Sequence, residues 1–132
     1  MFGGSGALGK AVVKRLNCEG FKVISIDLLN NSDAYQNIQI RPSWTLHDQS
    51  VAINDGLKDI LLKSKVSNVF CAAGGWKGGS IRDSDFVQFF HCNHTVNLEP
   101  EILATHFGIT RHSFLVLFDL QYNLNLSMTL KV

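Results

Sequence analysis

The chain has 132 residues, of which 45% are apolar and 17% charged, and this composition is typical of one globular domain rather than a disordered chain. Twelve basic residues nearly balance eleven acidic ones, and the absence of a basic face argues against a nucleic-acid partner. No apolar run approaches the roughly 18 residues of a membrane-spanning helix, so we expect no membrane partner.

The amino-terminal part predicts a turn, a helix and two strands. Glycine-rich residues 3–9 form the turn, and the helix that follows ends near Gly20. Lys22–Asp27 contains a β-branched run that predicts a strand. Residues 29–37 are polar and loop-like, and Ile38–Ile40 is expected to be a short strand.

The middle of the chain continues this alternation. Thr45 and Asp48 resemble a capping box, which begins a helix over 46–64. Val66–Ala72 predicts a further strand, and the four glycines within Gly74–Gly79 require a loop. Alternating strands and helices predict an α/β fold: an incomplete doubly wound parallel sheet, Rossmann-like, in three αβα layers.

The last third is less regular. A helix is expected from about Phe86, and Pro100 should interrupt it and start a second helix. A strand is expected over Ser113–Leu120. Residues 121–132 alternate between apolar and polar, as in a half-buried strand. We therefore expect a partial Rossmann-like domain over residues 1–120 and a strand-like tail over 121–132.

Gly4-Ser5-Gly6-Ala7-Leu8-Gly9 fits the G-x-G-x-x-G pattern of dinucleotide-binding turns. Gly4 permits the tight turn, Gly6 leaves room for the pyrophosphate, and Gly9 lets the helix pack closely on the strand. The helix amino terminus then offers free N–H groups to the phosphates. The alternative is a glycine-rich turn that binds no ligand.

An acidic residue follows at the expected distance. Asp27 lies 18 residues after Gly9, at the end of a predicted strand, where a Rossmann fold places an acid to bind the adenosine ribose. Its charge would repel a 2′-phosphate, which favours NADH over NADPH. The alternative is an ordinary aspartate in a turn. The neighbouring Leu28 is expected to contact the cofactor as well.

Small residues end the strand at Val66–Ala72. Ala72, Ala73, Gly74 and Gly75 would let the nicotinamide half of a dinucleotide lie across the strand ends, at the switch point of a doubly wound sheet. The alternative is a glycine-rich loop that only turns the chain.

Together these segments carry a family resemblance. Phe2–Gly9, Val23–Asp27 and above all Val69–Gly79, with its Ala73-Gly74-Gly75-Trp76 run, resemble the quinonoid dihydropteridine reductases of the short-chain dehydrogenase/reductase family. The resemblance is good over about residues 1–86. It implies transfer of a hydride from NADH to quinonoid dihydrobiopterin, which regenerates tetrahydrobiopterin, in a homodimeric cytoplasmic enzyme.

The resemblance also implies roles for individual residues. Trp76 would line the pterin pocket, where an aromatic wall suits a flat heterocycle; the alternative is a loop tryptophan at the domain edge. The cofactor-binding residues implied by the glycine turn, the acid and the small-residue segment are Gly3, Gly4, Ser5, Gly6, Ala7, Leu8, Gly9, Asp27, Leu28, Ala72, Ala73, Gly74 and Gly75.

The chain also departs from this family. The family's Tyr-x-x-x-Lys dyad is absent, because Gln39 stands four residues after Tyr35 and Leu126 four residues after Tyr122. We therefore assign no catalytic residue. The first strand, which is central in a Rossmann sheet, is almost missing. Its loss should leave backbone groups unpaired on the two strands that flank it. The chain is expected to end before the family's sixth helix and sixth strand, and the break at Pro100 should disturb the helix that forms the family's dimer interface.

Three hypotheses follow. In the first, the chain is a reductase of the dihydropteridine reductase type. In the second, it is a catalytically inactive remnant that binds a dinucleotide or partners a full-length subunit. In the third, it is part of another short-chain reductase with a non-pterin substrate. A metal site at His91-Cys92-Asn93-His94 is not expected, because the spacing matches no zinc finger. Cys71 is expected to be a small core residue rather than a nucleophile.

Overall fold

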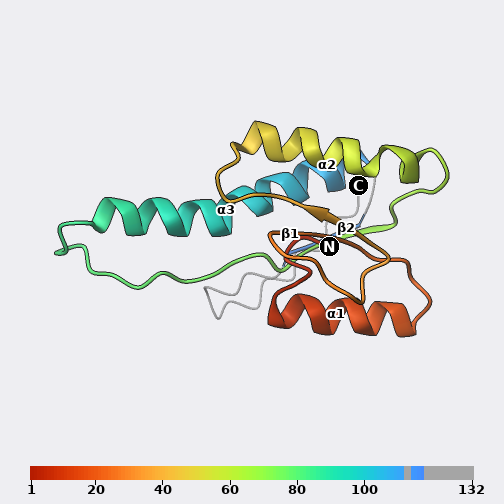
Figure 1. Cartoon of the computed structure of the whole chain (residues 1–132), viewed down its shortest axis with the longest axis horizontal. Helices are drawn as coiled ribbons and strands as arrows, with labels where there is room; N and C mark the ends of the chain where they lie inside the picture. Colours follow the sequence, from red (N-terminus) through yellow and green to blue (C-terminus); the bar gives the residue numbers. More distant parts are fainter. Residues whose placement is uncertain (112–113, 118–132) are drawn as a thin grey trace.

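The computed structural model describes residues 1–111 and 114–117, and these form three αβα layers. Helix α1 covers one face of a central sheet, and α2 and α3 cover the other (Figure 1). The elements in chain order are α1 (Ala7–Cys18), β1 (Ile24–Asp27), β2 (Gln36–Gln39), α2 (Leu46–Leu61), β3 (Asn68–Cys71), α3 (Phe86–Thr110) and β4 (Phe114–Leu117). The predicted α/β class and the incomplete parallel sheet are confirmed.

Met1 and Phe2 hold the centre of the sheet together. The parallel pairs β1–β2 and β3–β4 are separate from each other, and Phe2 bridges them through Ile26 on one side and Cys71 on the other. The Phe2 amide donates to Phe70 O at 2.8 Å, and the Ile26 amide donates to Met1 O at 2.9 Å. The expectation that an almost absent first strand leaves both neighbours unpaired is wrong, since two residues suffice to bond to each.

Pro100 does not break α3, contrary to the sequence prediction. The helix is continuous from Phe86 to Thr110 with Pro100 inside it. A proline inside a helix removes one hydrogen bond and costs about 3 kcal/mol. Tertiary contacts offset that cost here, because Leu103 and Phe107 are buried against the sheet beyond the proline.

The second strand begins earlier than predicted. Strand β2 spans Gln36–Gln39, although the polar composition of residues 29–37 indicated a loop. Parallel pairing with β1 aligns Ile24 with Gln36 and Asp27 with Gln39, so the neighbouring strand sets the boundaries. Only Ile38 of the four is buried, which explains why the apolar pattern was too short to locate the strand.

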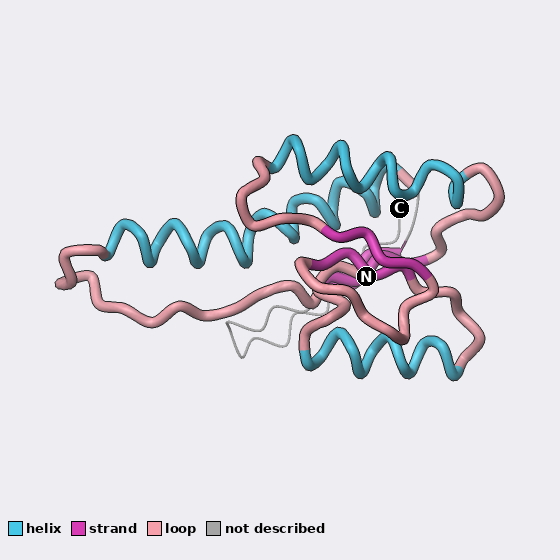
Figure 2. The backbone as a smooth tube through the Cα atoms, in the orientation of Figure 1, coloured by secondary structure: helices cyan, strands magenta, loops and turns pink. Residues whose placement is uncertain are grey.

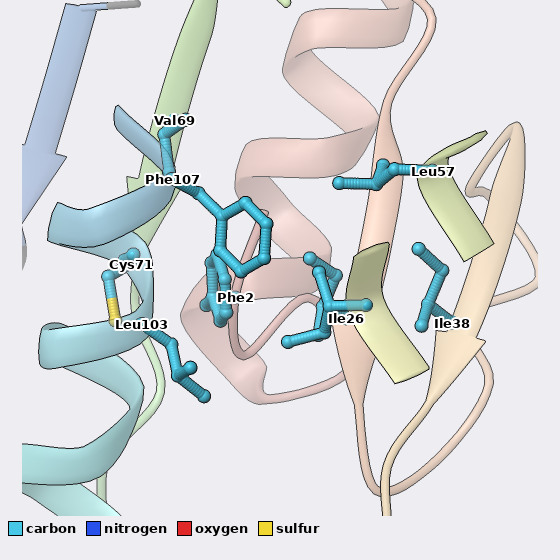
Figure 3. Close-up of a cluster of buried hydrophobic side chains, with 10 residues drawn as sticks. Phe2, Ile26, Ile38, Leu57, Val69, Cys71, Leu103 and Phe107 are labelled. Carbon is cyan, nitrogen blue, oxygen red and sulfur yellow. The ribbon is translucent and has the colours of Figure 1, made fainter. Parts of the chain in front are cut away.

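The main core lies between the sheet and the helices α2 and α3. Phe2 packs against Phe107 with ring centroids 6.3 Å apart, and Figure 3 shows the two rings together with Ile26 and Leu57. The capping box predicted at Thr45 and Asp48 is present at the start of α2. The smaller cluster on the opposite face centres on Met1, Val13, Val23 and Ala72.

The structure thus places the amino end of α1 and the carboxyl ends of β1 and β3 at one edge of the sheet. The segment between β3 and α3 leaves this edge and runs beside the amino-terminal half of α3, which projects beyond the sheet (Figures 1 and 2). The predicted tail at 121–132 lies outside the described residues.

Candidate functional site

The glycine turn is closely packed on three sides. Gly3 has a φ of 71°, and a Cβ there would lie 2.6 Å from the Ala72 carbonyl carbon. A Cβ on Gly4 would overlap Ser25 Oγ, and one on Gly9 would overlap the Gly3 carbonyl oxygen. Helix α1 therefore packs directly on the turn through Gly9, and Gly3 is the residue of the turn that takes the left-handed conformation.

The fourth side of the turn is open. Gly6 is the N-cap of α1, is exposed, and would place a Cβ no closer than 3.5 Å to its neighbour, Gly3 O. No side chain caps the helix, and Ala7 beside it is exposed while Leu8 is half-buried. The amino end of a helix carries a partial positive charge, so this opening fits an anionic group such as a pyrophosphate.

Asp27 is bonded to the glycine turn. Its Oδ2 accepts from the Ser5 amide at 2.7 Å, and its Oδ1 accepts from the Leu28 amide at 2.6 Å. Ser5 Oγ donates to Leu29 O at 2.6 Å, which ties the same two segments together a second time. Asp27 as a whole is half-buried, and it lies at the edge where α1 begins.

Asn31 supports the turn from beneath, and sequence reasoning missed it. The side chain is 1% exposed, and its Nδ2 donates to Gly4 O at 2.7 Å. Asn37 fixes it further, because Asn37 Oδ1 accepts from the Asn31 amide and Asn37 Nδ2 donates to Asn31 O. The polar composition of residues 29–37 gave no signal that one asparagine is buried.

The small residues after β3 divide into two groups. Ala72 is buried and Ala73 half-buried, both against Gly3. Gly74 and Gly75 are exposed and contact Asn97 of α3 instead. The structure therefore brings the glycine turn, Asp27, Leu28, Ala72 and Ala73 together. Trp76 is carried away from this group on the segment beside α3, and its side chain is 76% exposed.

Cys71 is a core residue, as expected. It is 1% exposed, and burial raises the pKa of its thiol to about 11. A thiol that stays protonated at neutral pH is a poor nucleophile. Among residues 1–111 and 114–117, no group of three or more His, Cys, Asp or Glu side chains is placed to hold a metal ion. None of the helices in these ranges is long and apolar enough to span a membrane.

A cavity of about 600 Å³ lies elsewhere, at the amino ends of β1 and β3. Its walls include Lys22, Ile24, Val66 and Asn68 and none of the cofactor-binding residues predicted from the sequence. The residues of the predicted cofactor site therefore lie outside this cavity, and those of the glycine turn lie at the open edge of the sheet.

Comparison with known proteins shows the family to which the chain is related. Residues 1–111 match the model of the NAD dependent epimerase/dehydratase family. A dihydropteridine reductase of Dictyostelium discoideum is 34% identical over 108 residues, which cover 82% of this chain and 45% of that protein. The chain thus spans about half the length of this relative. The resemblance to the dihydropteridine reductases that the sequence motifs indicated is confirmed.

Solved structures agree on the fold. The ligand-free aldohexose dehydrogenase of Thermoplasma acidophilum matches 88% of this chain and 46% of its own, with a TM-score of 0.71 and 23% identity. A 4-hydroxyisoleucine dehydrogenase complexed with NADH and succinate matches 89% of this chain and 55% of its own, with a TM-score of 0.60 and 23% identity. At this identity the likeness shows a shared Rossmann-type fold.

Proposed function

The chain belongs to the NAD dependent epimerase/dehydratase family, and we propose that it binds NADH and acts as a reductase of quinonoid dihydropteridines. The observation that carries the proposal is the direct bond between Asp27 and the glycine turn through the Ser5 amide. This bond holds the Asp27 carboxylate close to the open amino end of α1, which supports binding of an adenosine ribose and its phosphates at one edge. The similarity to a dihydropteridine reductase supports the substrate class.

The residues of this edge fit a dinucleotide. Gly6 and Ala7 would receive the pyrophosphate at the open amino end of α1, and Asp27 with Leu28 would hold the adenosine ribose. Ala72 and Ala73, which lie against Gly3, would face the nicotinamide half. The bound cofactor would supply the hydride, and the protein side chains would bind and orient the two reactants.

The catalytically inactive alternative has its own support. A positioned proton donor typically contributes 10²–10⁴-fold to rate. Gln39 stands where a Tyr35-based dyad would need lysine, and Tyr122 lies outside the described residues. We therefore expect slow turnover by the chain alone. A chain that binds NADH but shows no turnover would be the dinucleotide-binding remnant, or the partner of a full-length subunit.

We expect Asp27→Ala to weaken NADH binding by about 10- to 100-fold, since hydrogen bonds to a charged group contribute about 1.5–3 kcal/mol. Asp27→Asn keeps one acceptor and removes the charge, so it should narrow the preference for NADH over NADPH. Fluorescence titration with both cofactors measures the two effects. Equal affinities for NADH in the wild type and in Asp27→Ala would refute the ribose role of Asp27.

The homodimer implied by the resemblance is also proposed for this chain. The continuity of α3 through Pro100 removes the expected break in the dimer helix. Exposed apolar side chains follow one another along α3 at spacings close to those of a helix face: Val87, Phe90, Leu98, Ile102 and Ile109.

Phe90→Glu tests this interface, because Phe90 is 72% exposed in the single chain. A charge buried between two subunits should weaken the dimer by tenfold or more. Sedimentation equilibrium measures the change, with Ile81→Glu as the control, since Ile81 is 85% exposed and lies outside α3. A wild-type chain that remains monomeric would refute the proposed dimer.

A further inference from the structure

Two asparagines of α3 hold the segment that carries Trp76. Asn97 Oδ1 accepts from the Gly75 amide at 2.9 Å, and Asn97 Nδ2 donates to Gly75 O at 3.0 Å. Asn93 repeats the pattern on Lys77, with both bonds at 3.0 Å. Each side-chain amide therefore bonds to the backbone of one residue as a neighbouring strand would.

The spacing of the two elements explains why this pattern repeats. Four residues of helix rise about 6 Å, and two residues of extended chain advance about 6.6 Å. Asn93 and Asn97 are four apart on α3, and Gly75 and Lys77 are two apart on the segment. Residues on alternate positions of an extended chain direct their backbone groups to the same side, so both asparagines can bond at once.

The next pair of residues at the same spacing is in packing contact rather than hydrogen-bonded. Phe89 precedes Asn93 by four residues, and Gly79 follows Lys77 by two. A Cβ on Gly79 would overlap the Phe89 ring, and one on Gly74 would lie 2.9 Å from Asn97 Oδ1. Glycines at these positions therefore let the segment approach the helix, which accounts for much of the glycine content of Gly74–Gly79.

The two amides are themselves fixed in orientation. Asn93 Nδ2 also donates to Phe89 O at 2.9 Å, and Asn97 Nδ2 donates to Asn93 O at 2.7 Å. Both asparagine side chains are half-buried. Bonds to the carbonyl oxygens of their own helix leave the oxygen of each amide directed at the segment.

Trp76 lies between the two clamped residues and is 76% exposed. Without these bonds the glycine-rich segment would be free in solution, and ordering its backbone when a ligand binds would cost conformational entropy. We propose that Asn93 and Asn97 are positioning residues. By fixing the backbone on both sides of Trp76, they orient its ring as a stacking surface for a flat heteroaromatic substrate. This inference rests on the proposed pterin reductase function.

A purely structural role for the asparagines makes a different prediction. If they only anchor a loop, their loss should lower thermal stability and leave ligand affinity unchanged. If they position Trp76, their loss should weaken pterin binding much more than NADH binding, because the contacts of the glycine turn and Asp27 do not involve α3.

The experiment uses Trp44→Phe as the background, so that Trp76 is the remaining tryptophan of the two in the chain. The variants are Asn97→Asp and the double variant Asn93→Asp with Asn97→Asp, and both keep the shape of the side chain. Each replaces an Nδ2 donor by a charged oxygen, which would repel the carbonyl oxygens that Nδ2 bonds to in the wild type. Asn54→Asp is the matched control, because Asn54 makes the same kind of bond to the carbonyl four residues earlier, Ser50 O, and contacts no part of the Trp76 segment.

Three measurements are made on each variant: hydrogen exchange at the Gly75 and Lys77 amides, fluorescence anisotropy of Trp76, and the dissociation constants for NADH and for biopterin, a stable oxidised pterin. We expect exchange to become at least tenfold faster at the Gly75 amide in Asn97→Asp and at both amides in the double variant. Both variants should lower the anisotropy and weaken biopterin binding tenfold or more. NADH affinity should change less than threefold, and Asn54→Asp should match the background.

Biopterin binding that is unchanged in the double variant, or absent from the wild type, would overturn the positioning role. A wild type that binds biopterin but not NADH would refute the proposed cofactor function and leave the clamp supported by exchange and anisotropy. If the double variant fails to fold, Asn97→Asp alone, with its melting curve and its biopterin affinity, decides the question.

Discussion

Gly9→Ala should destabilise the fold by at least about 3 kcal/mol. A Cβ at Gly9 would overlap the carbonyl oxygen of Gly3 and lie 2.8 Å from Gly4 Cα. Both neighbours are backbone atoms, so no rotamer change relieves the overlap. Overpacking among side chains typically costs 1–3 kcal/mol, and a clash between helix and turn backbones should cost more. Thermal unfolding followed by circular dichroism measures the loss.

Gly6→Ala is the matched variant, three residues earlier in the same motif. Gly6 is exposed, its φ of −67° suits any residue, and the only neighbour of an added Cβ is 3.5 Å away. We expect the same melting temperature as the wild type and NADH binding weakened by tenfold or more, because the methyl group would stand where the pyrophosphate approaches. Unchanged NADH affinity in a folded Gly6→Ala protein would remove the pyrophosphate from this position.

The contrast between these glycines shows how far a motif can be interpreted from sequence. The spacing of Gly4, Gly6 and Gly9 indicated a dinucleotide turn, and the close packing of Gly9 on the turn agrees with that pattern. The spacing did not show that Gly3 takes the left-handed conformation, or that Asn31 supports Gly4 from a buried position. Those features depend on contacts across more than twenty residues.

Local signals predicted the end of α1 and the start of α2 better than the bounds of β2. The Thr45 capping box and Gly20, whose φ is 84°, each act within a few residues of a helix end, and both were found from sequence. Strand β2 was misplaced, because its ends depend on pairing with β1. The bridging role of Phe2 was missed for the same reason, since its partners Ile26 and Cys71 are distant in sequence.

The asparagine clamp was also beyond the sequence prediction. Asn93 and Asn97 lie four residues apart, which places them on one face of a helix. That spacing is visible in the sequence, but no motif indicates what the two asparagines bind. Its partner segment was predicted as an irregular glycine loop, and nothing in a single sequence shows that an extended loop matches the rise of a helix.

Pro100→Ala should stabilise the chain by about 2–3 kcal/mol. Pro100 lies inside α3, where it lacks the amide that would bond to the carbonyl of Val96, and its ring crowds that carbonyl. Alanine restores the bond and removes the crowding, and it loses only the smaller benefit of proline in stiffening the unfolded chain. For a chain of this size the melting temperature should rise by roughly 8–12 °C.

Pro42→Ala is the control, because Pro42 is the other proline of the chain and lies in the loop before α2. It should lower stability by up to about 1 kcal/mol, since alanine only increases the freedom of the unfolded chain. Opposite signs for the two variants would establish that α3 runs through Pro100. A loss of stability in Pro100→Ala would mean that the proline begins a separate helix, as the sequence alone predicted. In that case Pro100 would separate the part of the chain that carries Asn93 and Asn97 from the part that carries the buried Leu103 and Phe107. A contact other than a continuous helix would then have to fix the orientation of these two parts.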